Sequence, residues 1–454
     1  MIQQAKSRAN NPINSDPAEQ DHQDFRHLIR CVKIFGVACV IACVFYLLTR
    51  EKNIAQGILG SVFVLLALYH TPFGLMVLFT FLGLENVMVF RPDFSYSKLI
   101  GIIVLVSYLL KVFRYPFVMG VPQRLILFFC LWCWASYFWC VKPDATMPML
   151  QMLTLQIGVF FIMVNVIRDK KSFFVVLGGF AAGAIIISWL LMFGTVAYTT
   201  LSGEQMGRAV LAEGHSNPVI IGRAIAIGFI VTCLIFWKSN KILRYCACAV
   251  LALMFLALLT RTQSRLALFV AVLAPIFAFI MTADKRYRLK RLISAALIAG
   301  VAYFFMGFVL KSGLMTDMAR DRFVSQGFKE SGRLEMLADG LRLIASRPLH
   351  GYGIGNSSYA RTGRGKGGSL HNNFVGLVAD VGLVGLAPVV LLLIILYMQI
   401  YRITDPRLKW LGMAMLFYVV VSGITAVTYI QKDFWYPLQI AALTALLSRD
   451  EKRT

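Results

Sequence analysis

The sequence predicts an all-α polytopic integral membrane protein, a bundle of about 12 (range 12–14) transmembrane helices with a helical loop or cap on its external face. Three observations support this prediction. Hydrophobic residues make up 58% of the 454 residues, and the mean hydropathy is +0.71. Apolar runs of membrane-spanning length recur along the chain. Basic clusters fall at alternate connections between these runs, as expected where Lys and Arg stay on the cytoplasmic side.

Each expected helix corresponds to an apolar run with polar flanks, and the short runs 56–70 and 433–448 account for the range in the count. The candidate spans are 29–48, 56–70, 72–90, 98–113, 121–140, 148–167, 172–194, 217–237, 242–260, 265–281, 292–310, 374–400, 409–427 and 433–448.

The basic clusters also predict the orientation of the chain. With the N-terminus inside, five of them fall in the cytoplasm, including 284–291 and 402–409. Both termini are then cytoplasmic. The expected divisions are a cytoplasmic tail 1–28, a transmembrane bundle 29–310 with a short external loop 195–216, a large external loop 311–370, C-terminal transmembrane helices 371–448 and a cytoplasmic tail 449–454.

The external loop 311–370 is basic, with ten Lys or Arg against five Asp or Glu. Such charge normally remains on the cytoplasmic side, so a basic loop outside indicates an anionic substrate there. Within the loop, one helical face is apolar, and Pro348 ends the pattern. That face is formed by Leu334, Leu337, Leu341 and Ile344. We expect an amphipathic helix that lies on the bilayer or on the mouth of the bundle.

Four arginines are expected on or near the external side of the membrane. Arg208 lies in the loop 195–216, and Arg261 and Arg265 flank a short turn. Arg223 lies about six residues inside a span, where a charged side chain is costly unless it is paired or lines a wet cavity. Snorkelling towards the interface is the alternative explanation, above all for Arg261. Converging guanidinium groups bind phosphate oxygens bidentately, so these residues are candidate ligands of a diphosphate.

His371 opens an expected helix directly after the basic loop. An unperturbed pKa near 6.5 suits a histidine to general-base work at neutral pH, although a lone histidine at a helix start is more often structural. His215 is equally suited to capping a turn. Asp380 follows His371 by nine residues and faces roughly the opposite side of a straight helix, so a His–Asp relay is not expected without a break.

Cofactor motifs are not found in the external segments. No cluster there has metal-ligand spacing, which disfavours a metal-dependent glycosyltransferase. Gly351, Gly353 and Gly355 lack the spacing of nucleotide-binding loops and predict instead a tight turn that lets the backbone approach a ligand or the bundle. We therefore expect no metal, no cofactor and no nucleic-acid partner.

These features together resemble the bacterial O-antigen ligase and polymerase superfamily. Its C-terminal signature runs from an Arg-led helix through a Pro-Leu-x-Gly-x-Gly turn to a His-Asn helix start. The segments here are Ser331-Gly-Arg-Leu-Glu-Met336, Arg347-Pro-Leu-His-Gly-Tyr-Gly-Ile-Gly355 and Leu370-His-Asn-Asn-Phe374. The ligases share a His, then Asn, Ser or Gln, nine residues, Gly, two residues, and Gly, Thr or Tyr. The spacing of His371, Asn372, Gly382 and Gly385 fits this pattern.

The resemblance continues upstream and covers roughly residues 205–390. Ser264-Arg265 is similar to a Ser-Arg-Gly at a helix start in the family, although Leu266 replaces the glycine. His215-Ser-Asn217-Pro218 is similar to the Asn-Pro that precedes a central span, with Arg208 upstream. The first 200 residues match in hydropathy only.

The resemblance implies an O-antigen ligase activity, a glycosyltransferase with a lipid-diphosphate-linked donor, in the inner membrane of a Gram-negative bacterium. O-antigen would pass from undecaprenyl pyrophosphate to a sugar hydroxyl of lipid A-core at the periplasmic face, with inversion and without metal or ATP. His371 would act as the general base. The pyrophosphate would be bound by Arg265, Arg223, Arg208 and Arg261. Supporting roles would fall to Asn372, His215, Asn217 and Arg333.

Two kinds of alternative remain open at the level of the sequence. Within the superfamily, the chain could be an O-antigen or exopolysaccharide polymerase or a protein O-oligosaccharyltransferase. A flippase or transporter of polyanionic lipids belongs to another class and would use the arginines for binding alone. Its function would survive the loss of His371.

Overall fold

The computed structural model describes residues 17–49, 51–84, 89–91, 94–115, 117, 119–194, 197–201, 204–210, 218–235, 240–262, 264–312, 333–363, 370–425 and 429–450. Within these ranges the fold consists of 16 α-helices and two short β-hairpins. The first half contains α2 (Pro17–Thr49), α3 (Lys52–Tyr69), α4 (Thr71–Leu84), α5 (Tyr96–Leu109), α6 (Val121–Ala135), α7 (Pro143–Val166) and α8 (Lys170–Phe193).

The second half begins at α9 (Pro218–Ile235), and α10 ends in a π-helical turn, Ala257–Thr262. Its remaining helices are α10 (Lys241–Leu256), α11 (Arg265–Met281), α12 (Arg288–Lys311), α14 (Arg333–Ser346), α15 (Ser357–Thr362), α16 (Asn373–Tyr401), α17 (Pro406–Thr425) and α18 (Lys432–Asp450). Short 3₁₀ turns at Val112–Arg114, Ser136–Trp139 and Lys285–Tyr287 join some of them.

The predicted fold class is confirmed, since each of the expected apolar runs corresponds to a helix. Nine helices among the described residues are long and apolar enough to cross a membrane. Four more are apolar but shorter: Ile54–Tyr69, Thr71–Leu82, Tyr96–Leu109 and Arg265–Met281. The fourteenth run, 433–448, falls within α18. Apolar side chains cover outward faces, as on α12, where Leu297 is 67% and Phe304 77% exposed. Such surfaces suit contact with lipid.

Two hairpins were not predicted from the sequence. The expected span 72–90 ends earlier, at Leu84, and β1 (Val89–Arg91) pairs with β2 (Phe94–Ser95) instead of continuing the helix. In the expected external loop 195–216, β3 (Ala197–Leu201) pairs antiparallel with β4 (Glu204–Val210). Tyr198, Thr199 and Thr200 in β3 are residue types that favour extended backbone.

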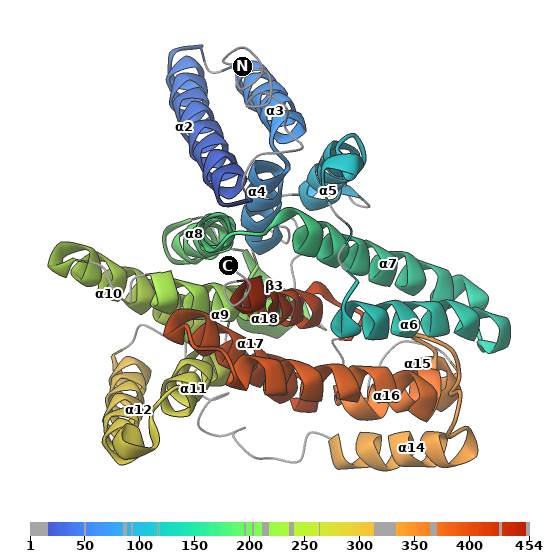
Figure 1. Cartoon of the computed structure of the whole chain (residues 1–454). Coiled ribbons are helices and arrows are strands. Elements are labelled where there is room, and N and C mark those ends of the chain that lie inside the picture. The colour runs from blue at the N-terminus through green and yellow to red at the C-terminus, as the bar shows by residue number, and fades with distance from the viewer. Residues whose placement is uncertain are drawn as a thin grey trace.

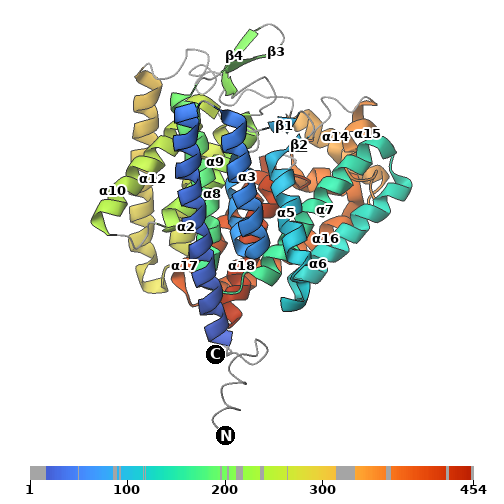
Figure 2. The ribbon, with the colours of Figure 1, turned by 90° about the horizontal axis from the view of Figure 1, so that it is seen from above.

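The ends of the bundle differ. Figure 2 shows the start of α2 at one end and the β3–β4 hairpin, α14 and α15 towards the other. We call the latter the hairpin side. Figures 1 and 2 agree that α10 and α12 lie on one flank, whereas α6, α7, α14 and α16 lie on the other. The largest fully buried side chains include Trp435, Tyr418 and Tyr429, which belong to the C-terminal part of the chain.

The predicted amphipathic helix is α14, which ends at Ser346, two residues before Pro348. Its contact face differs from the expected apolar one, because Leu334 is 66% and Leu341 55% exposed. The helix approaches α16 through Gly340 instead, where an added Cβ would lie 2.6 Å from Val375 Cγ1. The helix therefore lies on the bundle itself, and two of its leucines remain exposed on its surface.

An ion pair lies at the end of α16 that is opposite to its start beside His371. Lys170 Nζ, at the start of α8, lies 2.7 Å from Asp405 Oδ2 in the connection between α16 and α17. Burial by itself raises the pKa of Asp405, but the hydrogen bond and the charge of Lys170, together with backbone N–H groups, outweigh it. The pKa of this carboxyl is therefore lowered from its usual 3.8.

Candidate active site on the hairpin side

The helix that follows His371 is broken. Gly382 in α16 has φ 71° and ψ −178°, which is not a helical conformation. The break frees backbone groups of α16, and residues 347–356, here called the glycine turn, supply their partners. The four hydrogen bonds run from Tyr352 N to Ala379 O (3.0 Å), Gly353 N to Asp380 O (2.7 Å), Leu383 N to Pro348 O (2.8 Å) and Val384 N to Leu349 O (3.3 Å).

The glycines of the motif are needed for this docking. Gly351, Gly353 and Gly355 have φ of 68°, 92° and 74°, a region that L side chains rarely adopt. At Gly382 an added Cβ would lie 2.0 Å from Leu349 O. The prediction of a tight turn that approaches the bundle is therefore confirmed. The sequence did not indicate that the turn would dock into a broken helix, because the run around Gly382 is apolar apart from Asp380 and has the length of one continuous span.

A buried polar network lies beneath the turn. Asp380 is 2% exposed, and its Oδ1 accepts a hydrogen bond from Ser357 N at 2.6 Å. Its Oδ2 accepts a hydrogen bond from the hydroxyl of Tyr429. The backbone N–H of Tyr429 in turn donates to Asn373 Oδ1 at 2.6 Å. Asp380 thus joins the glycine turn, α16 and the segment before α18. The break in α16 falls after Asp380 and does not turn this carboxylate towards His371.

His371 has an unusual backbone. Its φ is 48°, and among the described residues it is the non-glycine residue with a positive φ. A left-handed conformation at such a residue is unfavourable by roughly 1–2 kcal/mol, and residues of this kind concentrate at functional sites. The side chain is exposed. Asn372 follows as the N-cap of α16, and its Oδ1 accepts from Phe374 N at 3.0 Å and Val375 N at 3.1 Å. Asn372 therefore fixes the helix start immediately after His371.

Arg223 is a buried member of an ion pair. The residue is 7% exposed, and its Nη1 lies 2.6 Å from Oδ2 of Asp433, which is 5% exposed. The same Nη1 donates to Gln431 Oε1 at 3.3 Å. Arg223 Nε and Asp433 Oδ1 are buried without a hydrogen-bond partner among the described residues. Asp433 was not predicted from the sequence, although an acid at the start of an apolar helix, at the same end as Arg223, is the kind of partner that a buried Arg requires.

Arg261 and Arg265 flank the turn between α10 and α11. Arg261 lies half-buried in the π-helical turn, a feature often found at functional sites, and Arg265 is the exposed first residue of α11. The residue before Arg223 packs against this turn: a Cβ added to Gly222 would lie 3.0 Å from Thr262 Oγ1. Arg223, Arg261 and Arg265 thus lie on adjoining elements, and we call them the arginine cluster.

The segment 429–433 joins His371 to the arginine cluster. At one end, Tyr429 bonds to Asn373, two residues beyond His371. At the other, Gln431 and Asp433 bond to Arg223. Residues that are far apart in the sequence are therefore connected through a few hydrogen bonds at the same ends of α9, α16 and α18.

The remaining predicted residues are described only in part. Arg208 lies in β4, a strand that contacts the π-helical turn of Arg261. Arg333 is the first residue of α14. His215 and Asn217 fall outside the described residues. No group of three or more His, Cys, Asp or Glu that could hold a metal ion occurs in the described part of the chain.

Part of the chain is similar to a known protein family. Residues 249–390 match the model of the family described as "O-Antigen ligase". Over this segment the chain is similar to that family. The matched segment contains Arg261, Arg265, the glycine turn and His371, whereas Arg223 and Asp433 lie outside it.

No curated protein sequence matches this chain. One chain of a solved structure, described as "Structural coordination of polymerization and crosslinking by a peptidoglycan synthase complex", is 13% identical with a TM-score of 0.43. The alignment covers 73% of this chain and 98% of that chain.

Proposed function

We propose that this chain transfers O-antigen polysaccharide from undecaprenyl pyrophosphate to a sugar hydroxyl of lipid A-core, at the periplasmic face of a Gram-negative inner membrane. One observation carries the proposal: an exposed His371 in a left-handed conformation is joined through segment 429–433 to the arginine cluster. The similarity of residues 249–390 to the O-antigen ligase family supports the class of chemistry, a transfer of lipid-linked glycan.

In the proposed reaction, His371 accepts the proton of the acceptor hydroxyl while the hydroxyl oxygen bonds to the anomeric carbon of the donor. The bond between that carbon and the diphosphate oxygen breaks, and its electron pair leaves with undecaprenyl pyrophosphate. A single displacement inverts the anomeric centre. The exposure of His371 supports this role, and the Asn372 cap holds the backbone beside it.

The arginine cluster stabilises the leaving diphosphate. Arg265 at the first position of α11 adds its guanidinium to the positive end of the helix dipole, a favourable place for phosphate oxygens. Arg261 lies four residues earlier, and Arg223 lies beneath the same turn with its charge partly balanced by Asp433. Donors held in place before the reaction favour the charge that develops in the transition state. The glycosyl–diphosphate bond supplies the driving force, so the reaction needs neither nucleotide nor metal.

The proposal requires the hairpin side to face the periplasm. The five basic clusters at the opposite ends of the spans support this orientation. Alkaline phosphatase fused at residue 365 should be active, whereas a fusion at residue 287 should be inactive. The reverse result would overturn the orientation and the mechanism with it.

Reconstitution tests the activity itself. Purified chain in lipid nanodiscs should transfer glycan from undecaprenyl pyrophosphate to lipid A-core in excess EDTA without nucleotide. His371→Ala should lose the transfer, and His27→Ala, a matched change in α2, should retain it. Activity restored only by magnesium or manganese would refute the metal-free mechanism. Transfer to a second lipid-linked repeat in place of lipid A-core would identify a polymerase, and lipid movement that survives His371→Ala would identify a transporter.

A further inference from the structure

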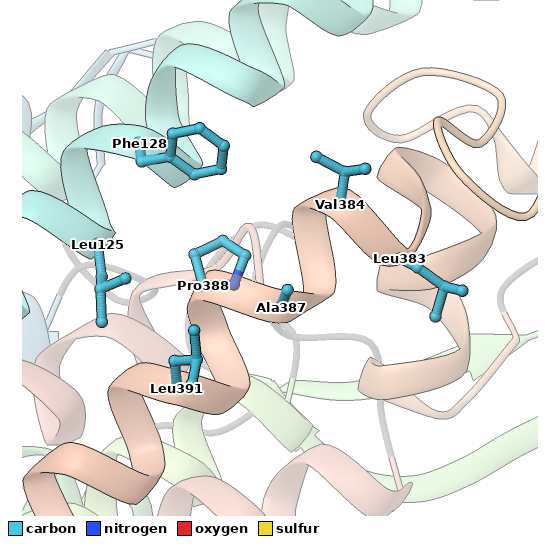
Figure 3. Close-up of a pocket in the computed structure, with 7 residues that line it drawn as sticks. All are labelled: Leu125, Phe128, Leu383, Val384, Ala387, Pro388 and Leu391. Carbon is cyan, nitrogen blue, oxygen red and sulfur yellow. The ribbon is translucent and has the colours of Figure 1, made fainter.

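A second feature of the fold, apart from His371 and the arginine cluster, is an apolar groove between α6 and α16. Its volume is about 420 Å³, which lies in the size range of small-molecule sites. Figure 3 shows Leu125 and Phe128 of α6 facing the side chains of α16 across it. All seven lining residues are apolar: Leu125, Phe128, Leu383, Val384, Ala387, Pro388 and Leu391. Three of them are also open to the surroundings, with Phe128 50%, Leu383 47% and Leu391 49% exposed.

The glycine turn is bonded to α16 at one end of the groove, here called the upper end. Leu383 and Val384, which line the groove, donate their backbone N–H groups to Pro348 O and Leu349 O. The groove therefore begins where α16 breaks and runs along the part of α16 that lies beyond the break.

Two tryptophans are bonded to backbone at this upper end. Trp132 Nε1 donates to Val381 O at 2.8 Å, and Trp139 Nε1 donates to His350 O at 3.0 Å. The two indole rings lie 5.3 Å apart. Tryptophan is enriched where membrane proteins cross the boundary between lipid chains and headgroups, since one edge of the ring is polar. The upper end of the groove therefore corresponds to headgroup depth, and its lower part to the depth of lipid chains.

Two cations lie at this level. Arg347, the first residue of the glycine turn, has its Cζ 4.7 Å from the ring centre of Tyr352. Lys142, just after Trp139, has its Nζ 5.1 Å from the ring centre of Tyr359. Neither forms a salt bridge with any residue that the structure describes. Aromatic faces orient both cations while leaving their positive charge available to an anion.

From these observations we infer that the groove binds an acyl chain of the acceptor, an anionic glycolipid whose phosphate lies at Arg347 and Lys142. The inference rests on the proposed function. An apolar groove on a membrane-embedded helix pair suits a lipid chain, and uncompensated cations at headgroup depth select a phosphorylated lipid. The arginine cluster for the donor lies on α9, α10 and α11, and α10 occupies the opposite flank (Figures 1 and 2). The groove is therefore separate from the donor site and can bind the acceptor lipid.

In this arrangement one helix both follows the general base and binds the acyl chain of the acceptor. The start of α16 follows His371, and its later residues line the groove. A lipid held in the groove is anchored to the same helix as the general base. The acceptor sugar can then reach the hairpin side while the acyl chain remains in the bilayer.

Filling the groove tests the inference. Ala387→Trp adds an indole at an exposed lining position, and Ile394→Trp is the matched control, 49% exposed on the same helix and outside the groove. Displacing about two methylene groups of a bound chain corresponds to roughly a tenfold loss of affinity. Ala387→Trp should raise the KM for lipid A-core about tenfold, with the donor KM and kcat unchanged, and Ile394→Trp should change none of them. A raised donor KM would assign the groove to the prenyl chain, and an unchanged acceptor KM would overturn the inference.

Binding without turnover separates this inference from the proposed function. Lipid A-core that carries a photoactivatable diazirine on an acyl chain should crosslink to residues 121–135 or 383–391 of the purified full-length protein, and Ala387→Trp should abolish the crosslink. Crosslinking without any glycan transfer would refute the proposed function and leave the groove assignment standing. Transfer without crosslinking at these residues would do the opposite. Arg347→Gln should weaken binding of phosphorylated lipid A-core but not of its dephosphorylated form, and equal effects on both would remove the phosphate contact.

Discussion

Removing the carboxylate of Asp433 should strongly destabilise the protein. The Arg223 guanidinium lies 2.6 Å from Asp433 Oδ2, and the two residues are 7% and 5% exposed. Asp433→Asn keeps the shape of the side chain but leaves the positive charge of Arg223 buried without its partner. Breaking a buried pair in this way costs about 3–5 kcal/mol of unfolding free energy. The partly exposed pair of Lys170 and Asp405 is the control, because neutralising it should cost only about 0–1 kcal/mol.

A double variant separates stability from function at this pair. Arg223→Met with Asp433→Leu replaces both charges by apolar side chains of similar size, a change that is often neutral or stabilising. Unfolding in detergent should therefore be close to that of the wild type, whereas glycan transfer should be lost because Arg223 no longer binds the diphosphate. A loss below about 1 kcal/mol in Asp433→Asn would refute the buried pair. Wild-type transfer by the double variant would refute the role of Arg223.

Donor binding gives an independent readout of the same pair. Undecaprenyl pyrophosphate brings negative charge to Arg223 and should partly replace the missing carboxylate of Asp433→Asn. The donor should then raise the melting temperature of Asp433→Asn by more than that of the wild type, since ligands stabilise the state that they bind. An equal shift in both proteins would mean that the diphosphate does not contact Arg223.

Three further predictions follow from the geometry. Arg265→Lys keeps the charge but loses the bidentate fork, so the donor Kd should rise about tenfold, and an unchanged Kd in a binding titration would exclude the fork. Gly382→Ala forces a Cβ to 2.0 Å from Leu349 O at φ 71° and should destabilise the fold by about 3 kcal/mol, whereas an unchanged melting temperature would contradict the broken helix. Because the folded pKa of Asp405 is lowered from 3.8, the stability that it contributes is complete above that value and is lost as the pH falls through the folded pKa. Chemical unfolding should therefore show a smaller acid loss in Asp405→Asn than in the wild type, and equal losses would refute the assignment.

Hydropathy predicted the helices well because each span must satisfy its own backbone hydrogen bonds inside a membrane. Every expected run is helical, and the amphipathic segment of the basic loop is α14. The structure differs from the expectation at the two β-hairpins, where residues that favour extended backbone form strands. The helix expected to reach residue 90 ends at Leu84, and within the expected loop 195–216 the strands β3 and β4 pair as a hairpin.

The site was predicted as a set of residue types, without its tertiary partners. His371 and the arginines followed from their place beside the external loops. The pairing of Arg223 with Asp433 did not, because it joins positions 210 residues apart in the sequence. The glycine turn was expected, yet its four hydrogen bonds to α16 depend on a break at Gly382 that apolar periodicity does not reveal. The link between Asp380, Tyr429 and Asn373 is likewise a product of packing.

The general-base role of His371 is the central claim, and single-turnover glycan transfer by purified His371→Ala tests it most directly. Donor and acceptor are preloaded, so the rate reports the chemical step alone. The variant should bind the donor and melt like the wild type, its transfer rate should fall by about 10²–10⁴-fold, and added imidazole should restore part of that rate. A folded His371→Ala that transfers glycan at near wild-type rate would contradict the claim.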